Sequence, residues 1–102
     1  MSIYVISAVR RDSMSDEVSH VRWAQVDAQG GGLIGAVVEA DAIDVVDEIQ
    51  AGNEVFTWHT VGGTEIRGRA VRVEALGNGN EVLRTDEADQ RHTLGLEDLP
   101  KF

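Results

Sequence analysis

The chain has 102 residues, enough for one ordinary domain with a modest core and too few for two domains of usual size. Its 42% hydrophobic and 26% charged residues are typical of a folded protein, and the lack of cysteine excludes disulfides, thiolate metal sites and a cysteine nucleophile. The net charge of −9 disfavours nucleic acid and anionic lipid as partners, because both bind through Lys and Arg. We expect a single domain over residues 1–102.

No stretch approaches the roughly 20 apolar residues of a membrane span. The opening run MSIYVISAVRR places its positive charges after its apolar residues, the reverse of a secretory signal. These features predict a cytoplasmic monomer that uses no cofactor and does not bind a membrane. An acidic surface can also mimic a phosphate backbone and occupy a basic protein, and the charge leaves that alternative open.

The first two predicted elements are strands. Ser2 to Arg10 alternates with apolar residues on both sides, which predicts an interior strand, and the turn-rich RDSMSDE leads into a second strand over Val18 to Asp27. Alternation in that strand places His20 and Arg22 on one face and Trp23 on the other. We therefore expect a β-hairpin with Trp23 in the core and His20 and Arg22 on the solvent side.

The next segment, AQGGGLIGAVVEA, is either extended or the lead-in to a helix, since three consecutive glycines disfavour regular structure. After it, Asp41 is a suitable helix N-cap and Gly52 a suitable C′ residue. Between them, apolar residues at i, i+3, i+4 and i+7 with acids opposite predict an amphipathic helix. Those apolar positions are Ala42, Val45, Val46 and Ile49.

Three further strands are predicted after the helix, over Glu54 to Thr60, Glu65 to Leu76 and Glu81 to Thr85, separated by VGGT and GNGN turns. The apolar phase shifts near Gly68 to Ala70, which predicts a β-bulge there. The tail offers apolar anchors around a short turn of helix before Pro100, namely Leu94, Leu96 and Leu99. The expected fold is α+β, with about five antiparallel strands in β-β-α-β-β-β order and the helix on one sheet face.

The exposed sheet face carries the candidate binding residues. Arg67 and Arg69 share one face of their strand and, with His20 and Arg22, could form a basic platform for a carboxylate or phosphate. The alternative is that these side chains are ordinary cross-strand ion pairs. The acids available for such pairs are Glu54, Glu65, Glu74 and Glu81.

Other motifs carry less chemistry. The three histidines, His20, His59 and His92, lack the spacing of a metal site, and no nucleophile motif accompanies them, so we expect neither a metal nor a catalytic residue. A literal G-x-G-x-x-G uses Gly30, Gly32 and Gly35, but hairpin-linked strands do not fit a dinucleotide-binding unit. A flexible glycine loop is the expectation there.

Several short motifs, VISAVRRD, VSHVRW, IQAGNEV, and LRT followed by LEDLP, resemble a family of small bacterial proteins labelled only as a domain of unknown function. The resemblance covers nearly the whole chain, although the glycine-rich segment is longer here than in that family, and it implies a common small domain without a known activity. The matching positions are Val9, Arg10, Val21, Arg22, Trp23, Gly52, Leu83, Arg84, Thr85, Leu96, Leu99 and Pro100.

The functional expectation is a non-enzymatic protein-interaction or binding module that works through the face bearing His20, Arg22, Arg67 and Arg69, or through the acidic helix. The alternative is a small-ligand protein whose arginines converge on a carboxylate or phosphate. A catalytic role would be favoured by a histidine or carboxylate that lies buried in a pocket with a shifted pKa.

Overall fold

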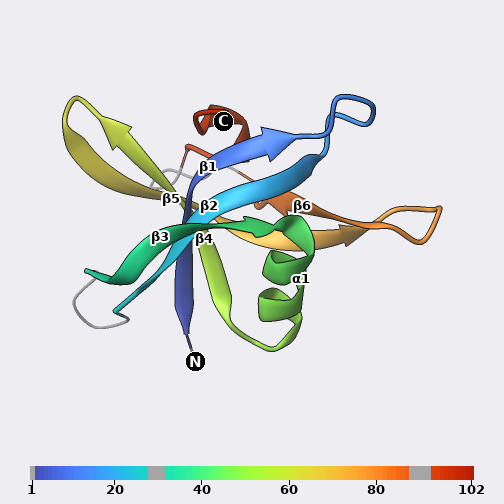
Figure 1. The fold of residues 1–102 in the computed structure, drawn as a ribbon, viewed down its shortest axis with the longest axis horizontal. Coiled ribbons are helices and arrows are strands. Elements are labelled where there is room, and N and C mark those ends of the chain that lie inside the picture. Colours follow the sequence, from blue (N-terminus) through green and yellow to red (C-terminus); the bar gives the residue numbers. More distant parts are fainter. Residues whose placement is uncertain (1, 28–31, 88–92) are drawn as a thin grey trace.

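Strands dominate the computed structural model, which describes residues 2–27, 32–87 and 93–102. In this part of the chain, six strands form one mixed sheet in the order β3-β2-β1-β4-β5-β6, with one α-helix against it (Figure 1). The elements are β1 (Ile3–Arg11), β2 (Val18–Val26), β3 (Leu33–Asp41), α1 (Ala42–Gln50), β4 (Glu54–Val61), β5 (Thr64–Ala75), β6 (Glu81–Thr85) and the 3₁₀ helix η1 (Leu96–Asp98).

The expected α+β class is confirmed, but the five-stranded antiparallel sheet is wrong in two respects. The segment Leu33–Asp41, whose conformation the sequence left open, is the edge strand β3. In addition, β4 pairs with β1 in parallel, from Ile3↔Glu54 to Ile6↔Thr57. The reason is the path of the chain: α1 carries it from the edge strand β3 back across the sheet, so β4 enters beside β1 and runs in the same direction.

The predicted interior position of β1 is confirmed, because β1 lies between β2 and β4. Its two faces are both buried, with Val5 2% and Ile6 0% exposed. Such continuous apolar sequence is expected of a strand that is covered on both sides.

The predicted β-bulge in β5 is also confirmed. Phe56 pairs with Ala70 but Trp58 pairs with Arg67, so β5 has one residue more than β4 between these two pairs. A Cβ on Gly68 would lie 2.1 Å from Thr57 Oγ1, which leaves no room for any side chain at the bulge. Glycine is therefore required where β5 approaches β4 and the C-terminal tail most closely.

Helix α1 begins and ends where the sequence predicts, and its Val45 and Val46 are buried. Gly52 follows with a φ of +96°, a conformation that suits a glycine at C′. Asp41 is the N-cap by position, but its side chain makes no cap hydrogen bond. Instead, Asp41 Oδ1 lies 2.8 Å from His20 Nε2 on the neighbouring strand.

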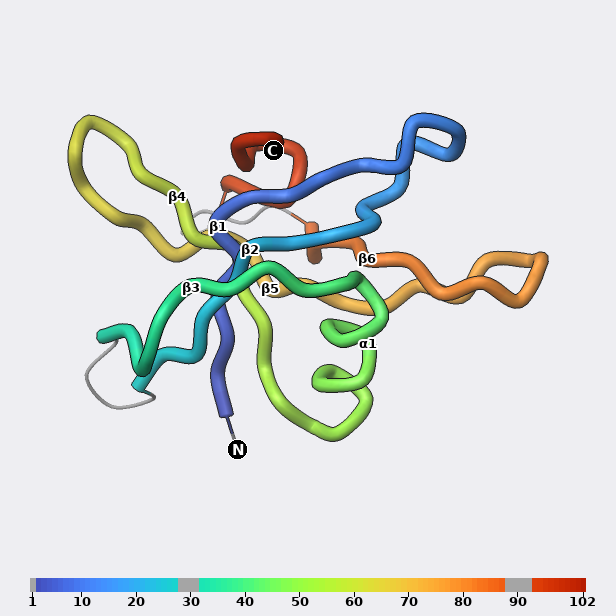
Figure 2. Tube along the Cα trace, viewed as in Figure 1, coloured from blue at the N-terminus to red at the C-terminus, as the bar shows by residue number. Residues whose placement is uncertain are grey.

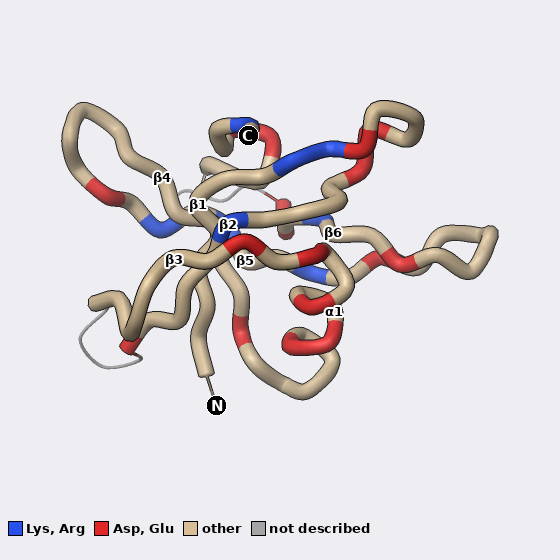
Figure 3. The backbone as a smooth tube through the Cα atoms, viewed as in Figure 1, with Lys and Arg blue, Asp and Glu red and all other residues tan. Residues whose placement is uncertain are grey.

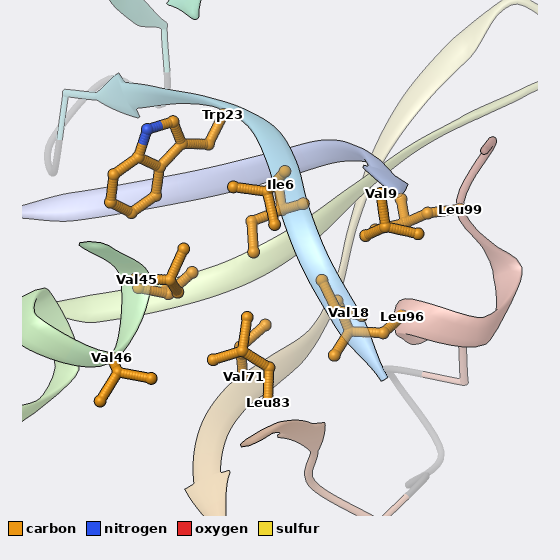
Figure 4. Close-up of a cluster of buried hydrophobic side chains, with 12 residues drawn as sticks. Ile6, Val9, Val18, Trp23, Val45, Val46, Val71, Leu83, Leu96 and Leu99 are labelled. Atoms are coloured by element: carbon orange, nitrogen blue, oxygen red, sulfur yellow. The ribbon is translucent and has the colours of Figure 1, made fainter. Parts of the chain in front are cut away.

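The core lies between α1, the sheet and the C-terminal tail (Figure 4). Trp23 is 8% exposed and its ring stacks on Tyr4 with centroids 4.7 Å apart, which confirms it as a core residue. No helix in the described ranges is both long and apolar enough to cross a membrane. The buried cluster consists of Ile6, Val9, Val18, Val21, Trp23, Val45, Val46, Val55, Val71, Leu83, Leu96 and Leu99.

Candidate functional site

The C-terminal tail returns to the middle of the sheet and lies beside β1 (Figure 2). The N–H of Val9 donates to the carbonyl of Pro100 at 3.0 Å, and the N–H of Phe102 donates to the carbonyl of Val9 at 3.1 Å. These bonds cover the edge of β1 beyond Ile6, where its pairing with β4 ends. The tail thereby fixes the backbone of Phe102 beside Val9.

Two arginines stack on the ring of Phe102. The guanidinium carbon of Arg22 lies 4.3 Å from the ring centroid and that of Arg10 lies 4.7 Å from it. The Nε of Arg10 also donates to the main-chain oxygen of Phe102 at 3.2 Å. Arg10, Arg22 and Phe102 form a continuous patch that we call the arginine–phenylalanine surface, in which the ring orders two guanidiniums that would otherwise be mobile.

The charge on this surface is incompletely balanced. Glu39 of β3 lies opposite Arg22 in the strand register, and its carboxylate is 3.9 Å from Arg10 with both side chains about half exposed. Figure 3 shows the red acidic and blue basic segments of the backbone, with red and blue next to each other where β2 and β3 run together. In the described residues, Arg22 has no ion pair of its own. Glu39 therefore pairs with Arg10 alone, and because both side chains are in solvent the stabilising effect of this pair is small.

His20 lies next to this surface, opposite Arg10 in the strand register, but both of its ring nitrogens are engaged. Nε2 is 2.8 Å from Asp41 Oδ1 and Nδ1 is 3.0 Å from Ser19 Oγ. The imidazole joins β2 to the start of α1 and presents no free nitrogen to a ligand. In this structure His20 thus connects β2 to the residue that precedes α1.

The other two predicted binding residues have partners elsewhere. Arg67 stacks over the ring of Phe56, with its guanidinium carbon 4.8 Å from the centroid. Arg69 is largely buried, at 12% side-chain exposure, where it pairs with Glu97 of η1 and donates to the carbonyl of Asp86 at 2.8 Å. None of these contacts links Arg67 or Arg69 to Arg22.

The predicted cross-strand pairs are also largely replaced by others. Of the four acids expected as partners, Glu74 lies 3.2 Å from the Nε of Arg84, an arginine outside the predicted set. Arg84 also forms a bidentate ion pair with Glu17, in which Nη1 donates to Oε1 at 2.6 Å and Nη2 donates to Oε2 at 2.9 Å. These hydrogen bonds lower the pKa of the Glu17 carboxyl. This pair joins the β1–β2 loop to β6.

Sequence reasoning missed Arg10 and Phe102 as site residues. Arg10 is predicted as the end of the first strand and as a position that matches the small bacterial family, but not as a site residue, and Phe102 lies 92 positions from it along the chain. One local signal was available. In the observed register of the predicted hairpin, Arg10 pairs with His20, so the hairpin places Arg10 beside a predicted site residue. Nothing local indicates that the tail returns to β1.

A second location has a buried histidine. His59 is 5% exposed, and its Nε2 lies 2.7 Å from the hydroxyl of Thr57, which is itself fully buried. Burial is the main cause that lowers the pKa of His59, so the ring is neutral at pH 7. His59 also lines a cavity of about 350 Å³, so it is a buried pocket histidine with a shifted pKa, the feature that would favour a catalytic role. A base must reach a hydroxyl that is open to substrate, and Thr57 is not, so this pair does not form a nucleophile–base arrangement.

The remaining motifs hold no site in the described residues. Within residues 2–27, 32–87 and 93–102, no three His, Asp or Glu side chains gather as metal ligands; His92 lies outside these ranges. Gly30 of the glycine motif also lies outside them, while Gly35 belongs to strand β3 and has a φ of +78°. The glycine segment thus leads into a strand and not into a phosphate-binding helix terminus.

Comparison of the chain with protein-family models, with curated proteins and with solved structures finds no match. The resemblance of its short motifs to a small bacterial family therefore stays a prediction.

Proposed function

We propose that this protein is a non-enzymatic, cytoplasmic interaction module whose arginine–phenylalanine surface receives an anionic side chain of a protein partner. The observation that carries the proposal is the pair of guanidiniums on one ring, 4.3 and 4.7 Å from its centroid. Guanidinium forks match the geometry of carboxylates, and an ordered pair loses little further entropy on binding.

In a chain with a net charge of −9, an exposed arginine without an acidic partner is unusual. Acidic residues outnumber Lys and Arg by 18 to 9, yet Arg22 stacks on an aromatic ring and pairs with no carboxylate in the described residues. One anionic side chain placed against Arg22 would supply the partner that Glu39 gives to Arg10. Because the overall charge of −9 repels strongly acidic proteins, the partner is expected to present an isolated carboxylate on an otherwise neutral or basic surface.

The test is an NMR titration of the ¹⁵N-labelled protein at low salt. The first probe is a short peptide with one glutamate among uncharged residues, and the second is inorganic phosphate. We expect the Nε–H signals of Arg10 and Arg22 to shift with the peptide. Arg22→Gln should weaken binding by roughly tenfold, the size expected for one charge-assisted hydrogen-bonded pair.

Arg67→Gln is the matched control, since Arg67 also stacks on a phenylalanine ring but has no second guanidinium on that ring. This variant should bind the peptide as the wild type does. Equal weakening in both variants would reduce the effect to general electrostatics and overturn the proposal. Binding of phosphate without the peptide would also overturn it, in favour of a small-anion protein.

A further inference from the structure

A cavity lies where the two central strands separate. β1 and β4 pair in parallel only as far as Ile6 and Thr57, because β1 continues along β2 while β4 continues along β5. Parallel neighbours whose chain connections lead to opposite sides leave a crevice at their carboxyl ends, a common place for ligands. The C-terminal tail closes this crevice, which we call the fork pocket; its volume is about 350 Å³, within the range of small-molecule sites.

The walls of the fork pocket come from three segments. Ser7 belongs to β1, Trp58 and His59 belong to β4, and Asp98 and Leu99 belong to the tail. This composition, an aromatic and aliphatic surface with a few polar groups, is typical of a site for a small organic molecule.

The hydrogen-bond network around His59 leaves one of its nitrogens available. In the tautomer with the proton on Nε2, His59 donates to Thr57 Oγ1 at 2.7 Å, and the Thr57 hydroxyl donates to the carbonyl of Leu94 at 3.4 Å. The lone pair then lies on Nδ1, for which the described residues supply no partner. Gly68 supports this network, since a Cβ there would lie 2.7 Å from His59 Nε2 and 2.5 Å from the Leu94 carbonyl.

Asp98 sets the charge of the fork pocket. Its Oδ2 accepts the N–H of Gly95 at 3.0 Å, and no described residue donates to its Oδ1. It is the only charged side chain among the described residues of the pocket wall. The nearby Arg69 is paired with Glu97 and does not line the cavity. The pocket therefore offers hydrogen-bond acceptors and a negative charge, with Trp58 among the residues of its wall.

We infer that the fork pocket binds a small organic ammonium ion, with its N–H groups directed to Asp98 Oδ1 and His59 Nδ1 and its apolar part against Trp58. Carboxylate and indole are the two protein groups that attract such a cation most strongly. The buried, neutral imidazole accepts a hydrogen bond without adding a competing positive charge. This site is separate from the arginine–phenylalanine surface, which has the opposite charge preference.

The test uses three probes of nearly equal shape at pH 7: benzylammonium, benzyl alcohol and benzoate. Binding is measured by NMR through the indole N–H of Trp58 and the backbone amides of Ser7 and Thr60. We expect benzylammonium to shift these signals, benzyl alcohol to bind more weakly and benzoate not to bind. Benzoate binding as strongly as benzylammonium, or none of the three binding, would overturn the inference, and this comparison needs only the wild-type protein.

Asp98→Asn removes the charge but keeps an oxygen that accepts the Gly95 N–H. It should weaken benzylammonium binding by roughly tenfold, as loss of one charge-assisted contact does. Glu97→Gln is the matched control, because it makes the same change one residue away at a side chain that does not line the pocket. Unchanged affinity in Asp98→Asn, or an equal loss in both variants, would contradict a specific role for Asp98.

Discussion

Gly68 shows how a single residue can determine the contact between two parts of this fold. Its missing side chain lets β5 approach Thr57 and the carbonyl of Leu94 together. We predict that Gly68→Ala lowers the free energy of unfolding by about 1–3 kcal/mol, the usual cost of forcing extra volume into a packed site. Urea denaturation measures this, with Gly77→Ala as control because a Cβ there meets nothing within 4 Å. Equal effects of both substitutions would contradict the steric explanation.

His59 should make stability depend on pH near neutrality. Burial lowers the pKa of the folded ring below 6.5, although Asp98 and Glu97 oppose that shift. As the pH falls through about 6.5, the unfolded chain takes up the proton first, so stability is lost toward acid and is retained at higher pH. Urea midpoints between pH 7.5 and 5.5, spanning about one unit on either side of that value, should therefore decrease.

The control for this prediction is His59→Asn, which cannot titrate in the same range. It should have a smaller slope of unfolding free energy against pH, whatever its stability at pH 7. The pKa of the Glu17 carboxyl is lowered by its hydrogen bond to Arg84. Glu17 therefore changes the unfolding free energy mainly near and below pH 4.5, outside the pH range of this comparison. An identical slope in the variant would show that other groups cause the pH dependence.

Among the elements, helix α1 contributes to the hydrophobic core through one of its faces. Val45 is fully buried, whereas the larger Ile43 is 56% exposed. We predict that Val45→Ala costs about 2 kcal/mol in unfolding free energy, from two lost methyl groups and the cavity they leave. Ile43→Ala removes more atoms but should cost less than about 0.5 kcal/mol, because its side chain remains in water. Thermal or urea unfolding that ranked the two in the opposite order would contradict the orientation of α1.

Strand β3 lies at the edge of the sheet, and this position is the reason that its sequence shows no clear strand pattern. Its residues are nearly all exposed, including the apolar Ile34, Val37 and Val38. A strand with one buried face shows alternation, but this edge strand has no buried face that would impose it. Gly35, with its φ of +78°, further interrupts regular pairing with β2.

The whole molecule shares a single core. The buried cluster takes side chains from β1, β2, α1, β4, β5, β6 and η1, so no element has an apolar interior of its own. We predict that the chain unfolds in one cooperative transition, as a single domain does. In a Trp58→Phe variant, fluorescence reports on the core residue Trp23 alone, and its urea transition should coincide with that of far-UV circular dichroism. Two separate midpoints would contradict a single cooperative unit.

The sequence by itself determined the features that depend on local periodicity. The 3.6-residue period located α1 with its buried Val45 and Val46, and alternation placed Trp23 in the core. The change of phase near Gly68 located the bulge, and the tail's leucines located η1 before Pro100. These features were predictable because a burial pattern is written within ten or so neighbouring residues.

Only the tertiary structure decided which distant segments meet. The parallel pairing of β1 with β4, the return of Phe102 to Arg10 and Arg22, and the burial of Arg69 against Glu97 follow from the path of the chain. Periodicity shows that a residue has a buried or exposed side, but not what lies against it. Both proposed sites depend on the tail, whose contacts with β1 span as many as 93 positions, from Val9 to Phe102, and no local pattern records a contact at that separation.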